Sequence, residues 1–232
     1  MKTLSLLFAL FLPAPLHATT VLIDFGSSSS TNGNGLTTGQ PQTWNNVTNY
    51  AAHTTGLLKN TAGNDTAITL TLGGAFSNIA SEAPKPVSSP YPTTATGDAF
   101  FQSTPITLTL NNLNPEETYN ITFYGFLSRS TTRNTSVSIS DATQSYEASN
   151  MRTGGTDAAP TGMTNPNGGS TTFLSVSPDS NGVISMNIAQ GSGNTGFYIL
   201  GVMEITSVPE PSAALLSLLG TVPLLLRRRS AR

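Results

Sequence analysis

Apolar and polar residues alternate along much of this chain with a period of two. In the segment 67–72, the apolar side chains Ile68, Leu70 and Leu72 fall on one side and threonines on the other. Alternation of apolar residues with β-branched polar ones is typical of a strand with one buried face and one wet face. The same pattern predicts three further strands, at 106–110, 137–139 and 184–188.

Three other runs are apolar on both sides of the predicted strand. They lie at 21–25, 119–126 and 197–205. Such runs indicate strands that are central in a sheet or covered on both faces. Turn-forming pairs separate the predicted strands, with Asn114-Pro115 in one link and Asn181-Gly182 in another.

These patterns predict an all-β fold for the body of the chain, residues 19–207. No stretch in this range has the periodicity of an amphipathic helix of about ten residues. About eight or nine strands in one domain favour an antiparallel β-sandwich of jelly-roll type. Two segments, 26–63 and 74–99, exceed ordinary connection lengths, which is typical of functional or partly disordered loops.

The predicted sandwich has few charges and no cysteine. Residues 19–207 contain five basic and eleven acidic side chains, a net charge of −6 with histidine neutral, and no run of basic residues. Nucleic acids and anionic lipid surfaces are bound by clustered Lys and Arg, so nucleic acid is not an expected partner. The lack of cysteine excludes disulfides, thiol catalysis and thiolate metal sites. Stability must therefore come from the hydrophobic core.

The N-terminus has the pattern of a secretory signal peptide. Lys2 precedes an apolar run at 4–12, and a short segment then leads to Ala18. A basic start, a short hydrophobic region and a small residue at the cut are typical of such peptides. We predict a signal peptide at 1–18 with cleavage after Ala18, although Leu16 is larger than the residue usual at its position. An uncleaved anchor is the alternative, but the run is too short to span a bilayer.

The C-terminus combines a proline-rich neck, an apolar run and a basic cluster. The neck, Val208-Pro209-Glu210-Pro211, cannot propagate a helix because each proline lacks an N–H. The run at 213–226 would be about 21 Å long as a helix, against a bilayer core of about 30 Å. Bilayer thinning and arginine snorkelling can cover that difference. The cluster Arg227-Arg228-Arg229 favours a cytoplasmic tail, with everything upstream outside.

This tripartite order resembles the PEP-CTERM sorting tail of bacterial exported proteins. The resemblance implies a transmembrane sorting helix within 208–232 and an exosortase-like membrane enzyme as partner, cutting near the Pro-Glu-Pro segment. It also implies export, a transient stay in the inner membrane, and delivery to the cell surface or extracellular matrix. A plain C-terminal membrane anchor is the alternative. The residues of the sorting signal would be Val208, Pro209, Glu210, Pro211, Arg227, Arg228 and Arg229.

The body is similar to uncharacterised bacterial PEP-CTERM proteins whose domains resemble carbohydrate-binding β-sandwiches. The landmarks are an opening strand that ends Ile23-Asp24-Phe25-Gly26, the tripeptide Trp44-Asn45-Asn46, Tyr91-Pro92, Asp98-Ala99-Phe100-Phe101 and Leu113-Asn114-Pro115. This similarity implies a fold far better than it implies a ligand.

The sole tryptophan suggests a site for carbohydrate. A flat indole face stacks well on a sugar ring, and Asn45 and Asn46 beside Trp44 could hydrogen-bond to sugar hydroxyls. These three residues are the candidate carbohydrate-binding site, with polysaccharide as the candidate partner. In the structural alternative, Trp44 covers the edge of the sandwich and its N–H is satisfied by a loop carbonyl.

Residues with catalytic chemistry form no recognisable motif. His53 is the only histidine left after signal removal, and no positioned nucleophile or His-Glu-x-x-His pattern accompanies it. A glycoside hydrolase needs two carboxylates close together. Asp24, Asp98 and Glu204 lie in or beside apolar runs, but sequence alone places no two of them together. We therefore predict no catalytic residue, and the adjacent Glu116 and Glu117 are expected to stay wet in a turn.

No metal site and no cofactor are predicted either. The segment Asp179-Ser180-Asn181-Gly182 has two oxygen ligands in the style of a calcium loop, but it lacks the closing glutamate of an EF-hand, and a hairpin turn explains it. A structural calcium ion elsewhere in the sandwich is left open. Arg129 and Arg133 are expected to pair with a carboxylate such as Asp98.

The leading hypothesis from the sequence is an exported, non-catalytic protein of the cell surface or matrix. Its sandwich would have a structural role and would bind carbohydrate. A dedicated carbohydrate-binding module and a polysaccharide hydrolase are the two alternatives.

Overall fold

The computed structural model describes residues 18–27, 42–81, 91–126, 133–141, 145–154, 169–194 and 196–209. The chain divides into two compact units, Thr19–Val208, and Met1–Ala18 with Pro209–Arg232. The predicted signal peptide and sorting tail lie outside the described residues, except for Ala18, Val208 and Pro209. Within the part that is described, no helix has the length and apolar character needed to cross a membrane.

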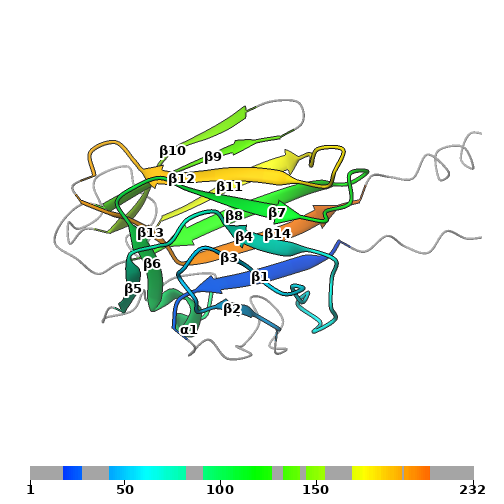
Figure 1. The fold of residues 1–232 in the computed structure, drawn as a ribbon, viewed down its shortest axis with the longest axis horizontal. Coiled ribbons are helices and arrows are strands. Elements are labelled where there is room, and N and C mark those ends of the chain that lie inside the picture. The colour runs from blue at the N-terminus through cyan, green and yellow to red at the C-terminus, as the bar shows by residue number, and fades with distance from the viewer. Residues whose placement is uncertain are drawn as a thin grey trace, which may run out of the picture. The chain divides into compact units, whose positions relative to one another are not determined.

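The described residues form fourteen strands and one short helix (Figure 1). In chain order these elements are β1 (Thr20–Phe25), β2 (Asn45–Val47), β3 (His53–Thr54), β4 (Thr69–Leu72), β5 (Asn78–Ser81), α1 (Thr93–Thr96), β6 (Asp98–Gln102), β7 (Ile106–Asn111), β8 (Thr118–Gly125), β9 (Arg133–Ser140), β10 (Ser145–Gly154), β11 (Gly169–Val176), β12 (Ile184–Gln190), β13 (Tyr198–Leu200) and β14 (Val202–Val208).

Two large sheets contain most of these strands. One has five strands in the order β11-β8-β14-β1-β2, and the other has six in the order β10-β9-β12-β7-β4-β3. A smaller sheet has the order β13-β6-β5. Neighbouring strands are antiparallel, apart from the parallel pair of β1 and β2. The predicted antiparallel β-sandwich is thus confirmed, with one parallel pair as an exception. Parallel neighbours need a long connection between them, and a long connection separates β1 from β2.

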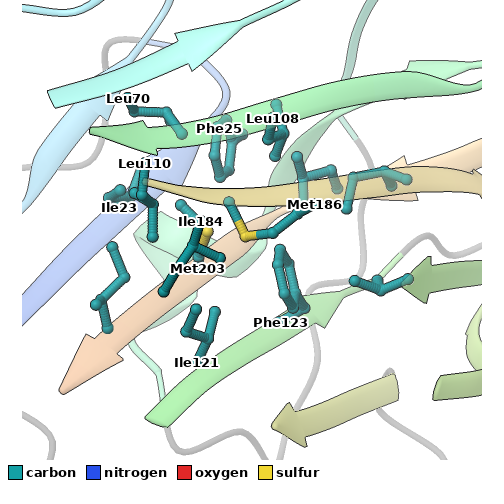
Figure 2. Packing of buried hydrophobic residues seen from close by; sticks show 14 of the residues in the cluster. Ile23, Phe25, Leu70, Leu108, Leu110, Ile121, Phe123, Ile184, Met186 and Met203 are labelled. Carbon is teal, nitrogen blue, oxygen red and sulfur yellow. The ribbon is translucent and has the colours of Figure 1, made fainter. Parts of the chain in front are cut away.

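The apolar faces of the two large sheets pack on each other to form the core. Figure 2 shows Ile23, Phe25, Ile121, Phe123 and Met203 of the five-stranded sheet together with Leu70, Leu108, Leu110, Ile184 and Met186 of the six-stranded sheet. All ten side chains are buried. The strands predicted from period-two alternation are confirmed, and their apolar positions are the ones that face the core.

The outer face of the six-stranded sheet is lined with hydroxyl groups. One row of register partners has a serine or threonine on each of the six strands. Adjacent strands in a sheet lie about 4.8 Å apart, so neighbouring hydroxyls in this row can bond to each other. The Oγ1 atoms of Thr54 and Thr71 do so at 2.8 Å. The row consists of Thr54, Thr71, Thr109, Ser185, Ser140 and Ser145.

The single strand predicted at 197–205 is wrong, because the chain changes sheet at Gly201. Strand β13 pairs with β6 before this residue, and β14 pairs with β1 and β8 after it. The Gly201 N–H donates to Tyr124 O at 3.1 Å, and Phe25 N–H donates to Gly201 O at 2.8 Å. A side chain at Gly201 would put its Cβ 3.2 Å from Tyr124 O, so glycine suits this close approach.

The two long predicted loops contain regular structure. Strands β2 and β3 lie within 26–63, and β5, α1 and the start of β6 lie within 74–99. These elements are two to five residues long. Elements this short contain too few repeats of the apolar–polar alternation to be recognised from the sequence. The rest of both segments, 28–41 and 82–90, lies outside the described residues.

The core packing can be tested at Phe123, which is fully buried in the cluster of Figure 2. We expect Phe123→Ala to lower the free energy of unfolding by about 3–5 kcal/mol, because it removes buried contacts and leaves a cavity. Leu174, which is 64% exposed on β11, is the control. Leu174→Ala should change stability by less than about 0.5 kcal/mol. Chemical denaturation of both variants would measure this difference, and equal losses would contradict the core assignment.

Candidate functional site

The end of the sandwich where β1 begins and β14 ends lies at the right of Figure 1. A pocket of about 300 Å³ is lined by residues at this end. Four separate parts of the chain form its walls. The lining residues are Thr19, Asn60, Asp65, Thr66, Ala67, Ile68, Asn112, Asn114, Glu117, Tyr119, Ile205 and Ser207.

One wall is the turn between β7 and β8. Its backbone bends at Asn112, which has a φ of 60°, a conformation that asparagine tolerates better than most residues. The Asn114 N–H donates to the Tyr119 hydroxyl at 2.9 Å, and Asn114 Nδ2 donates to Glu117 Oε1 at 3.2 Å. The turn thereby holds an amide, a carboxylate and a phenol at the pocket wall.

The opposite wall is the segment before β4. Asn60 Oδ1 accepts hydrogen bonds from the N–H groups of Ala62 and Asn64, both at 3.0 Å, which shapes a tight turn. Asp65 follows this turn and forms a 2.6 Å ion pair with Lys59. Between the two walls, Thr19 N–H donates to Ser207 Oγ and Ser207 N–H donates to Thr19 O, both at 2.9 Å. The first and last strands are thus joined at the pocket.

The lining chemistry suits an uncharged ligand with many hydroxyl groups. Amides, hydroxyls and two carboxylates line the pocket together with apolar patches, and no Lys or Arg lies among the lining residues. An anionic ligand would therefore meet the Glu117 carboxylate, while the Lys59 ammonium is already paired with Asp65. Burial raises the pKa of Tyr119 above its usual value, so this phenol remains a neutral donor at neutral pH. The volume lies at the small end of the range of about 300–1,000 Å³ for ligand pockets.

Sequence reasoning missed this pocket. Its polar residues come from the two chain ends of the sandwich and from two turns, so no motif joins them. The only local signal is the asparagine-rich stretch Asn111-Asn112-Leu113-Asn114, which marks a turn but says nothing about a ligand.

The candidate residues lie elsewhere. Asn45 and Asn46 are in the edge strand β2 of the five-stranded sheet, and Trp44, just before this strand, packs on the outer face of the sheet. Trp44 is only 7% exposed and packs edge-on against Tyr91, with ring centroids 6.0 Å apart. Asn45 Nδ2 donates to Leu22 O and Lys59 O, and Asn45 Oδ1 accepts from Lys59 N–H. Asn46 is exposed. The burial of the ring favours the structural alternative. The loop carbonyl expected to accept a hydrogen bond from the Trp44 N–H is not found, and this N–H has no hydrogen-bond partner.

The acids in apolar runs are brought to this same face. Glu204 Oε2 accepts a hydrogen bond from the Tyr91 hydroxyl at 3.0 Å. Asp98 Oδ2 accepts from the Ser27 N–H at 2.7 Å and from the Ser27 hydroxyl. Asp24 is 1% exposed, and neither of its carboxylate oxygens has a hydrogen-bond partner. Burial, and then the nearby Asp98 carboxylate, raise the pKa of Asp24 to about 9.

The other sequence candidates occupy structural positions. His53 Nδ1 lies 2.8 Å from Ala51 O in the short strand β3. Asp179 Oδ1 accepts from the N–H groups of Asn181 and Val183, both at 2.9 Å, so the calcium-like tetrapeptide is a turn. Over the ranges that the structure describes, no group of three His, Cys, Asp or Glu residues could hold a metal ion.

Arg133 does not form the ion pair with Asp98 that was expected from the sequence. Its guanidinium lies over the Phe197 ring, 4.1 Å from the centroid. Such cation–π contacts stabilise a charge next to an apolar surface. Asp98 binds Ser27 instead. Arg129 lies outside the described residues.

Comparisons with known proteins show a shared fold. No family model matches the chain, and no curated protein matches it. Among solved structures, the plant receptor-like kinase ANX2 is similar with a TM-score of 0.50 and 13% identity, over 83% of this chain and 49% of that one. The ANX1 ectodomain from Arabidopsis thaliana is similar with a TM-score of 0.46 and 12% identity, over 82% of this chain and 48% of that one. The chain therefore spans about half the length of these two structures.

Another solved structure shows a weaker likeness. TmCBM61, solved in complex with β-1,4-galactotriose, has a TM-score of 0.33 and 9% identity, over 60% of this chain and 88% of that one. At 13% identity, the likeness to ANX2 shows a shared fold and nothing about the ligand of this chain.

The burial of Asp24 predicts an unusual pH dependence of stability. The folded state keeps a proton on Asp24 up to about pH 9, whereas the unfolded state releases it near the ordinary aspartate pKa of 3.8. The free energy of unfolding should therefore fall as the pH rises through this window. We expect Asp24→Asn to remove this contribution and flatten the profile. Denaturation at several pH values, in buffer free of divalent cations, would measure both curves, and parallel curves would contradict the assignment.

Proposed function

We propose that this chain is an exported, non-catalytic protein of the cell surface or extracellular matrix whose β-sandwich binds a neutral saccharide. We also infer a jelly-roll connectivity for the sandwich. Supporting it, β1-β14-β8-β11 in one sheet lie opposite β7-β12-β9-β10 in the other, and the chain crosses repeatedly between the two.

The observation that best supports saccharide binding is the pocket at the end of the sandwich. Its amides, hydroxyls and carboxylates offer both donors and acceptors, as a polyol requires. Its apolar patch at Ala67, Ile68 and Ile205 suits the C–H surfaces of a sugar ring. Asn112 and Asn114 are exposed, so a longer sugar chain can continue into solvent past them.

The adjacent pair Glu116 and Glu117 provides a matched test of this site. Glu117 lines the pocket and Glu116 does not. A carboxylate accepts stronger hydrogen bonds from hydroxyls than an amide does, so Glu117→Gln should weaken saccharide binding about tenfold. Glu116→Gln should bind like the unmodified protein. A screen of the full chain on immobilised neutral oligosaccharides, followed by calorimetry on the best binder, would measure this.

Each result of that experiment has a clear meaning. Equal binding by both variants would place the saccharide outside the pocket. Absence of binding to any neutral oligosaccharide would leave a purely structural role. Release of free sugar by the same preparation would indicate a hydrolase instead.

Processing of the C-terminal tail by an exosortase-like enzyme is the second part of the proposal. Val208 is the last residue of β14 and is the register partner of Thr118 on β8. Pro209 is the first residue beyond the sheet. A protease needs an extended backbone that is free of sheet pairing, and the pairing of β14 continues through Val208. We therefore expect the cut on the C-terminal side of Val208, after which the body leaves the inner membrane.

Replacement of Pro209, Glu210 and Pro211 by alanine tests this processing. The variant should remain membrane-bound at full length, because the neck that the enzyme would recognise is gone. A chain that ends at Val208 should be released without processing. Fractionation of a host that encodes an exosortase, with the mass of the released protein, would measure both effects. If the alanine variant were processed like the unmodified chain, only the plain anchor would remain.

A further inference from the structure

Asp24 and Asp98 present three carboxylate oxygens that have no hydrogen-bond partner. Both oxygens of Asp24 and Oδ1 of Asp98 are buried and unpartnered. Asp24 is 1% exposed and Asp98 is 6% exposed. Nearly all buried polar atoms in proteins have a hydrogen-bond partner, so three unpartnered oxygens on two neighbouring carboxylates require an explanation.

The two carboxylates are brought together by backbone that leaves room for no side chain. Asp24 lies near the end of β1, and Asp98 is the first residue of β6. Gly26 lies two residues after Asp24 in the chain, and a Cβ at this position would collide with the Asp98 carboxylate. The Ser27 N–H and hydroxyl then hold Asp98 Oδ2, which leaves Oδ1 unbound. Both carboxylates are buried, so the surrounding fold fixes their positions.

No side chain described around Asp24 supplies a positive charge. The surroundings of Asp24 include Asn45 and Asn46 of the neighbouring strand β2, and the threonines and alanine of α1. The outward-facing side chains of β8 and β14 include Tyr124 and Glu204. The described basic side chains have other contacts, Lys59 with Asp65 and Arg133 with Phe197. Two buried carboxylates of the same sign need a proton or a metal cation between them.

We propose that Asp24 and Asp98 bind a hard divalent cation of the Ca²⁺ type. Ca²⁺ is bound by carboxylate oxygens together with hydroxyl, carbonyl and water oxygens. Asp24 can contribute both oxygens and Asp98 can contribute Oδ1, and all three are free of other bonds. Neutral oxygens would complete the coordination, since the described residues include no third acid at this place.

Such a cation would fasten both long connections to β1. Ser27 stands at the start of the connection 26–63, and Asp98 stands at the end of the connection 74–99. The second connection contains α1 and Tyr91, which cover Leu22, Trp44 and Tyr124 on the outer face of the five-stranded sheet. The role of the cation is to hold this cover in place, and it is independent of saccharide binding in the distant pocket.

Calorimetric titration and thermal unfolding of the full chain test the proposal. The protein is first stripped with a chelator, and CaCl₂ is then added, with MgCl₂ as a second probe. Binding should raise the melting temperature by about 5–10 °C at a hundredfold excess over the Kd. Asp24→Asn should lose the binding heat and the temperature shift, yet still fold, because the carboxylate that it replaces has no partner to lose.

A surface carboxylate provides the matched control. Asp65 is 62% exposed in its ion pair with Lys59, so Asp65→Asn should keep the full Ca²⁺ response. The proposal is overturned if the unmodified chain shows neither heat nor shift with millimolar Ca²⁺ or Mg²⁺, or if Asp24→Asn responds like it. In that case the two carboxylates are stabilised by a shared proton.

Discussion

The face-to-face packing of two apolar sheet surfaces is the constraint on which the structure depends. The inward side chains of β1, β8 and β14 lie against those of β4, β7 and β12, and they are almost fully excluded from water. With no cysteine in the chain, no disulfide can substitute for this contact. Burial of this kind contributes about 25 cal/mol for each Å² of apolar surface, which makes it the main term that opposes chain entropy.

That packing also decides what the outward side chains can do. On the six-stranded sheet the outward positions are hydroxyls such as Thr54 and Thr71, whose Oγ1 atoms lie 2.8 Å apart. On the five-stranded sheet Leu22, Tyr124 and Val202 point outward and must be covered, so Trp44, Tyr91 and α1 pack over them. Asp24 is two residues from Leu22 on the same face and is buried by the same cover. Its high pKa is a consequence of that neighbourhood.

The pocket and the end of the last strand lie at the same end of the sandwich. The pocket is lined by Thr19 and Ser207, which join the first and last strands through two hydrogen bonds. Strand β14 ends one residue later and leads into the Pro-Glu-Pro neck. Strand β14 lies between β8 and β1 and is paired with both. A cut beyond Val208 would leave this pairing intact.

The sequence by itself determined the strands that alternate in polarity, because the alternation of buried and exposed residues is visible within each short segment. It therefore predicted the segments of β4, β7, β9 and β12 and an all-β sandwich. Tertiary structure decided the features that depend on residues far apart in the chain: the change of sheet at Gly201, the burial of Trp44, the meeting of Asp24 with Asp98, and a pocket built from four segments. The physical reason is that periodicity is a local property, whereas strand partners and packing neighbours are chosen by the whole chain as it collapses into one core.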